Sequence, residues 1–237
     1  MKIAENNVRG IPMKFVAYTR SLELCSRMNY ETENLDFIDQ IKPGEILFDL
    51  GACEGRFSIY AALKGVKCYS FEPEKNNYSA FLENIQVNSL SQDIVKAYKL
   101  AIGEANKKGK LKIGQPWAGG HQKVVEQVET REDLKFDFKD EEEIEVVGLD
   151  QFIEDGNVEC PDYLKVDIDG SEVSFLQGAQ KTLNNKRLKK VIFELETNDK
   201  NFDSIISNLK KNGLEEDQRF GVPNEPHLFN IVFKRIS

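Results

Sequence analysis

Hydrophobic positions along the chain form short apolar runs separated by stretches with helical spacing. Runs typical of buried strands occur at 45–50, 66–71, 94–101, 163–167 and 190–194. Apolar residues recur at helical intervals at 55–64, 74–88, 172–183 and 202–211. Strands that alternate with helices in this way form right-handed parallel crossovers. The pattern therefore predicts an α/β fold, a mostly parallel sheet with helices on both faces.

The two ends of the chain depart from this alternation. From Met13 to about Gln40 the apolar spacing is helical, so we expect residues 1–42 to form an N-terminal helical appendage to one domain at 43–237. Leu214 to Phe220 and Leu228 to Lys234 are strand-like with no helix between them, which predicts an antiparallel last strand. Such a strand separates a methyltransferase sheet from a dehydrogenase sheet. Residues around 103–145 are polar and glycine-containing, and we interpret them as an inserted region of hairpins or loop.

Composition narrows the class of protein. A chain of 237 residues, 40% hydrophobic, can bury one sizeable core. Its formal net charge of −8 opposes binding to a polyanion, so no nucleic-acid partner is expected. The four cysteines are scattered without a CxxC pair, and no apolar run approaches the roughly 18 residues of a membrane span. These features predict a cytoplasmic protein without a membrane span.

The first candidate for ligand binding is the segment in which a strand runs into a glycine loop and a helix. Gly51 and Gly55 would let the backbone approach a ligand, with helix N–H groups aimed at an anion. The alternative is that both glycines serve as turn residues with positive φ. Asp49 lies within the apolar strand, where a carboxylate needs a partner, either a cationic ligand or the N–H groups of the loop.

An acidic residue follows the second strand. Glu72 lies 21 positions after Gly51, the place where the acid of a dinucleotide-binding unit accepts hydrogen bonds from both ribose hydroxyls. The alternative is that Glu72 caps the helix that begins near Glu74.

The fourth strand ends at Asp167, on the edge where open α/β sheets bind ligands. Asp169 and Glu172 follow it, either as further charge near a ligand or as an N-cap and a favourable charge at the start of a helix.

Together these segments resemble the FkbM-type methyltransferases. The matching segments are Asp49 to Gly55, Phe71-Glu72-Pro73, Ala101-Ile102-Gly103 and Lys165 to Glu172, within a resemblance from about Ile46 to Phe233. Cys53, Glu54 and Asp169 depart from the residues common in the family. The resemblance implies a Rossmann-like class I methyltransferase fold and S-adenosylmethionine as cofactor. We expect cofactor contacts at Asp49, Gly51, Ala52, Glu54, Gly55, Glu72, Pro73, Ala101 and Asp167.

The resemblance also implies O-methylation of a hydroxyl on a sugar or small molecule by one in-line displacement. A positioned base contributes about 10²–10⁴-fold to such a step. The candidates are Asp167, Glu194 and His121, the last in a Gly-Gly-His loop. A hard divalent ion held by Asp167 and its neighbours is chemically compatible with these residues, although their spacing does not establish it.

Two other classes of function stay open. A nicotinamide-dependent oxidoreductase shares the strand, glycine and acid arrangement, but Cys53 stands where the second glycine of its Gly-x-Gly-x-x-Gly motif would be. A cofactor-binding or interaction module without catalysis is not excluded by the sequence.

Overall fold

The computed structural model describes residues 2–125, 137–156 and 158–236. Its central sheet has seven strands in the order β12-β13-β11-β10-β3-β4-β5. Five neighbouring strands are parallel: β5 (Val95–Tyr98), β4 (Lys67–Phe71), β3 (Ile46–Leu50), β10 (Tyr163–Val166) and β11 (Lys190–Glu196). The last strand, β13 (Glu225–Arg235), is antiparallel to both β11 and β12 (Leu214–Val222). The predicted sheet, with its antiparallel last strand, is confirmed.

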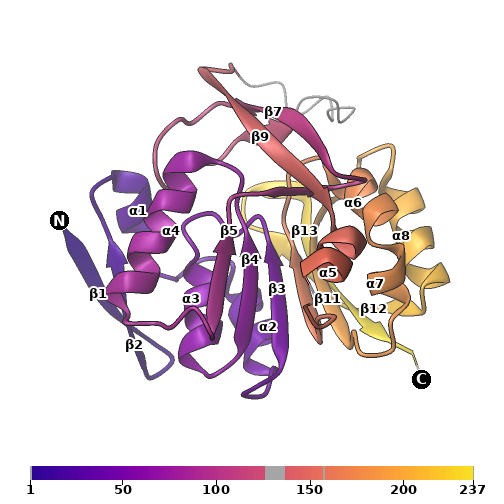
Figure 1. Cartoon of the computed structure of the whole chain (residues 1–237), viewed down its shortest axis with the longest axis horizontal. Helices are drawn as coiled ribbons and strands as arrows, with labels where there is room; N and C mark the ends of the chain where they lie inside the picture. Colours follow the sequence, from indigo (N-terminus) through magenta and orange to yellow (C-terminus); the bar gives the residue numbers. More distant parts are fainter. Residues whose placement is uncertain (1, 126–136, 157, 237) are drawn as a thin grey trace.

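Helices cover both faces of this sheet (Figure 1), because successive side chains of a buried strand point to opposite faces. Leu47 of β3 packs in one core cluster and Phe48 in the other. The first cluster includes residues of α2 (Thr32–Asp39), α3 (Arg56–Leu63) and α4 (Lys75–Val87). The second includes residues of α5 (Leu149–Gly156), α6 (Glu172–Gly178), α7 (Gln180–Asn184) and α8 (Phe202–Lys211).

The N-terminal segment begins differently from its prediction. Two helices are present, α1 (Arg20–Cys25) and α2, but they follow a hairpin of β1 (Ile3–Val8) and β2 (Ile11–Val16). The helical interpretation of residues 13–16 is therefore wrong. Met13 and Phe15 are buried on alternate positions of β2, and the side chain of Asn84 on α4 accepts a hydrogen bond from Val16 N at 2.8 Å. Contacts with α4 thus decide the local structure.

The inserted region forms a second, smaller sheet. Its strands lie in the order β6 (Ala101–Gly103), β9 (Asp140–Gly148), β7 (Lys107–Ile113) and β8 (Lys123–Val125). β7 and β9 pair as antiparallel strands and lie across the end of the main sheet at which its parallel strands finish (Figure 1). The acidic stretch at 132–145 belongs to the region predicted to form hairpins or loop. Its residues 140–145 lie in β9, and its part at 132–136 falls outside the described residues.

Candidate active site

A cavity of about 560 Å³ opens at the carboxyl ends of the parallel strands, beneath the small sheet. Its size suits a cofactor, since ligand cavities span about 300–1,000 Å³. Most of the predicted site residues line it: Gly51, Ala52, Glu54, Glu72, Pro73, Ala101, His121, Asp167 and Glu194. Asp49 and Gly55 are not among the lining residues.

The two glycines of the loop between β3 and α3 are required by close packing. Gly51 has φ +79°, and a Cβ there would lie 1.7 Å from the carbonyl oxygen of Asp167. Gly55 has φ +82°, and its Cβ would lie 2.0 Å from the ring of Phe81 on α4. Because neither position has room for a side chain, the loop runs directly beneath the end of β10 and against α4.

Glu72, at the end of β4, presents its carboxylate to the cavity while both of its oxygens accept backbone hydrogen bonds. Cys53 N donates to Oε2 and Glu74 N donates to Oε1, each at 2.9 Å. Burial raises the pKa of Glu72 to about 7, although the Lys123 ammonium opposes this shift. Each oxygen keeps a second lone pair for a ligand hydroxyl.

The helix-capping alternative for Glu72 is wrong. The side chain of Glu74 caps α4, accepting hydrogen bonds from the backbone N–H groups of Asn76 and Asn77 at 2.9 and 2.8 Å. Glu72 is thereby left to face the cavity.

Asp49 lies behind the cavity wall, paired within the protein. Its Oδ2 accepts a hydrogen bond from Ser58 Oγ at 2.6 Å, and its Oδ1 lies 3.6 Å from Lys165 Nζ. This placement favours a role in fixing the base of the glycine loop over direct contact with a ligand.

Lys165 is a cavity-lining residue that sequence reasoning missed. Its side chain is 5% exposed, and Nζ donates to Asp167 Oδ2 at 3.1 Å. Burial alone would lower the pKa of Lys165, but Asp167 and Asp49 raise it by more, so the net shift is upward. A lysine in the apolar strand Tyr163–Val166 was the available signal, because a buried cation needs a carboxylate partner.

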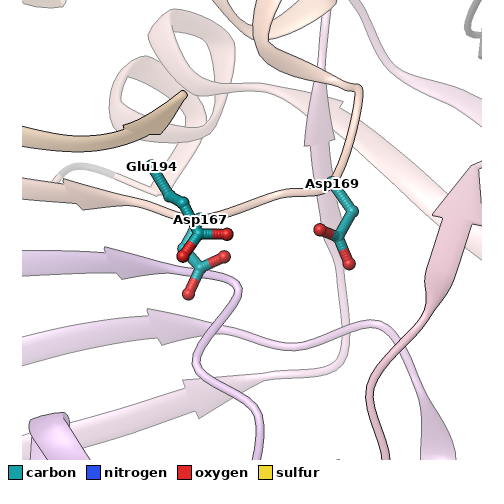
Figure 2. Close-up of side chains that lie close together, drawn as sticks. All are labelled: Asp167, Asp169 and Glu194. Carbon is teal, nitrogen blue, oxygen red and sulfur yellow. The ribbon is translucent and has the colours of Figure 1, made fainter. Parts of the chain in front are cut away.

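Three carboxylates meet at the ends of β10 and β11. Oxygen atoms of Asp167, Asp169 and Glu194 lie within 4.8 Å of one another, and Figure 2 shows the carboxylates of Asp167 and Glu194 side by side with that of Asp169 facing them. Burial raises the pKa of Glu194 well above its usual range, and Asp167 and Asp169 raise it further. The protonated form of Glu194 is therefore favoured beside Asp167. Such oxygens suit a hard divalent ion, but acidic groups alone do not identify one.

Arg56 and Glu54 present buried polar atoms that have no hydrogen-bond partner among the described residues. Arg56 stacks on the Tyr30 ring at 4.1 Å, and its Nη2 pairs with Glu31 at 2.5 Å. Its Nη1 and the Oε1 of Glu54 make no hydrogen bond to a described residue, and Oε1 lies 3.9 Å from Arg56 Nε. A donor and an acceptor of opposite charge beside one cavity suit the amino-acid end of S-adenosylmethionine, as Glu72 suits the ribose end.

His121 reaches the cavity from the inserted region. It lies on residues 114–122, the strap that connects β7 to β8. The residue is exposed, and its backbone N–H donates to Gln115 Oε1 at 3.1 Å. The structure thus brings all three candidate bases to one cavity, with His121 on the strap and Asp167 and Glu194 on the sheet edge.

The glycine loop, the acid that follows β4 and the antiparallel last strand define a Rossmann-like methyltransferase. Residues 49–216 match the family model of the methyltransferase FkbM domain, which is more than half of the chain. The chain belongs to the FkbM methyltransferase family, and S-adenosylmethionine is its cofactor. This excludes the nicotinamide-dependent class.

Solved structures agree on the fold. The FkbM methyltransferase of Methylobacillus flagellatus KT superimposes with a TM-score of 0.54 at 18% identity, covering 81% of this chain and 44% of that one. A precorrin-6y C5,15-methyltransferase of Geobacter metallireducens GS-15 gives a TM-score of 0.54 at 10% identity, covering 94% of both chains.

One curated relative is similar over a shorter stretch. A tRNA (guanine(37)-N(1))-methyltransferase of Phytophthora infestans is 30% identical over 112 residues, 40% of this chain and 27% of that protein. The chain therefore spans less than half the length of this relative and of the Methylobacillus structure. Within the described residues, no helix has both the length and the apolar character needed to cross a membrane.

Proposed function

We propose that this methyltransferase methylates a hydroxyl group on a small molecule or carbohydrate, with Asp167 as the base. The observation that carries the proposal is the placement of Asp167. Its side chain is 32% exposed on the cavity wall, and it is held there by the buried Lys165.

The proposed step is a single displacement. The cofactor supplies an electrophilic methyl group bonded to its sulfonium sulfur. Asp167 would take the hydroxyl proton as the acceptor oxygen bonds to this methyl group, with the sulfonium sulfur as the leaving group. The products are a methyl ether, S-adenosylhomocysteine and a proton. Burial raises the pKa of Glu194 and favours its protonated form, which leaves Asp167 to take the acceptor proton.

A nucleic-acid acceptor is the second candidate, because a relative is named as a tRNA methyltransferase. The net charge of −8 argues against it, as do Asp169 and Glu225 in the cavity lining. These carboxylates would repel phosphates, which supply most of the affinity in nucleic-acid binding. The function we propose is methylation of a small-molecule or carbohydrate acceptor in the cytoplasm.

The test is transfer of a trideuterated methyl group from labelled S-adenosylmethionine to a panel of metabolites, oligosaccharides and unmodified tRNA, read by mass spectrometry. We expect the label on a hydroxyl of a small acceptor, as an ether that resists alkaline hydrolysis. With that acceptor, Asp167→Asn should lower kcat by at least about tenfold with little change in cofactor affinity, since it removes the base. Asp203→Asn, on the exposed face of α8, is the control. Label on tRNA, or on an amine, would contradict the proposal.

A further inference from the structure

The strap, residues 114–122, contributes part of the cavity wall and is fastened to α4 by one side chain. Asn77, in the first turn of α4, is 1% exposed. Its Oδ1 accepts a hydrogen bond from Gly119 N at 2.8 Å, and its Nδ2 donates to the carbonyl oxygen of Gly120 at 3.2 Å. Gly120, His121 and Gln122 line the cavity, as does Asn77 itself. Asn77 therefore fixes the end of the strap that faces the cofactor.

The same amide also reaches the loop that binds the cofactor. Asn77 Nδ2 lies 3.0 Å from the sulfur of Cys53, within hydrogen-bond distance. The backbone N–H of Cys53 in turn donates to Glu72 Oε2 at 2.9 Å. One line of hydrogen bonds thus joins the strap, α4 and the ribose acid Glu72. Displacing Asn77 would disturb the wall and the ribose site together.

The opposite side of the strap is held by α1 and the residue before it. Thr19 Oγ1 donates to the carbonyl oxygen of Ala118 at 2.7 Å, and Trp117 Nε1 donates to Ser21 Oγ at 3.0 Å. Gly119 has φ +76°, and a Cβ there would lie 2.8 Å from a backbone nitrogen of α1. Because α1 leaves no room on this side, the strap is fitted between two helices, and Asn77 sets its position between them.

We infer that Asn77 is a positioning residue which holds the strap against the cofactor loop and thereby slows release of the cofactor. Without its amide, the Gly119 N–H and the Gly120 carbonyl are left unpaired in a buried place, which favours local opening of the strap. An opened strap removes one wall from the bound cofactor, so the effect falls on the dissociation rate. The inference requires cofactor binding only and is independent of the acceptor.

The experiment measures release of S-adenosylhomocysteine by stopped-flow displacement, with backbone hydrogen exchange of the strap as a second readout. Asn77→Leu keeps the side-chain size and removes all three hydrogen bonds, so we expect release to be at least about tenfold faster. Exchange should rise at 114–122 and, in the absence of any ligand, also at 51–55. The matched control is Asn88→Leu, which removes an asparagine at the other end of α4 that bonds the backbone of Lys14. Its release rate should change by less than about twofold.

A second variant approaches the strap from α1. Gly119→Ala leaves Asn77 in place, but the added Cβ would lie 2.8 Å from a backbone nitrogen of α1 at a φ of +76°. The strained backbone must shift, which disturbs the hydrogen bond from Gly119 N to Asn77 Oδ1, so release should again be faster. This variant tests the inference if Asn77→Leu does not fold. Faster exchange in the strap with unchanged release, in either variant, would overturn the inference. So would equal effects of Asn77→Leu and Asn88→Leu on release, because the response would then reflect general loss of stability.

Discussion

We expect Glu72 to make cofactor affinity dependent on pH, in a direction that its surroundings determine. The carboxylate already accepts the N–H groups of Cys53 and Glu74, and its pKa of about 7 means that it ionises within the ordinary working range. Only the ionised form offers both oxygens as strong acceptors for ribose hydroxyls. We therefore expect affinity for S-adenosylhomocysteine to fall by up to about tenfold between pH 8.5 and pH 6.

Replacement of the side chain gives the magnitude at fixed pH. Glu72→Ala removes a charged acceptor worth about 1.5–3 kcal/mol per hydrogen bond, so the dissociation constant at pH 8.5 should rise by at least about tenfold. The variant should also lose the pH dependence. The measurement is isothermal titration calorimetry with S-adenosylhomocysteine at pH 6, 7 and 8.5, with the exposed Glu215→Ala as the control.

The same group links pH to the stability of the ligand-free protein with the opposite sign. Its pKa is raised in the folded state from 4.5 to about 7, so its contribution to stability is fully present below pH 4.5 and is lost as pH rises through about 7. The cost of ionising it when folded is about 3 kcal/mol. Relative to Glu72→Ala, the wild type should lose up to this amount of unfolding free energy between pH 4.5 and pH 8. Equal affinity at all three pH values in the folded wild type, or an alanine variant that binds as tightly, would refute the role assigned to Glu72.

Three further outcomes are expected. Gly51→Ala should lower the unfolding free energy measured in urea by several kcal/mol, because its Cβ would lie 1.7 Å from a carbonyl oxygen. Gly44→Ala, at a similar φ with nothing within 4 Å, should lower it by only about 1–2 kcal/mol. Equal losses would contradict the packing argument. Arg56→Met breaks a buried ion pair and should lower the unfolding free energy by about 3–5 kcal/mol, and a loss below 1 kcal/mol would show that the pair is solvated. Glu194→Gln preserves a neutral hydrogen-bonding side chain and should reduce turnover less than Asp167→Asn does in the same assay; the reverse order would make Glu194 the base.

The features predicted well from the sequence are those that depend on short stretches of chain. The sequence predicts a strand at Ile46–Leu50 because this run is apolar except for Asp49. A strand that is buried on both faces, as this one is, has such a run. Glu72 was found from its distance to Gly51, since the strand, helix and strand between them have a nearly fixed length. In both cases local spacing and tertiary structure agree.

The missed features depend on contacts between distant residues. The hairpin β1–β2 is secured by asparagines of α4, 68 and 74 residues further along the chain, and no local pattern contains that information. Arg56 contacts Tyr30 and Glu31. Both of these partners lie in a segment outside the family resemblance. Asp49 is a further example of a feature that depends on distant residues. Its carboxylate contacts Ser58 and Lys165 instead of lining the cavity.

The position of β13 also has a consequence for the order of folding. Among the described strands, β12 hydrogen-bonds to β13 alone, although it precedes β13 in the chain. During synthesis β12 therefore emerges before β13, the strand that connects it to the sheet, and until β13 pairs, β11 presents an unpaired edge. Unpaired edges of this kind promote association between chains. For this protein, the interval between synthesis of β11 and docking of β13 is one in which a sheet edge is open to aggregation, and conditions that slow this last pairing should lower the yield of folded protein.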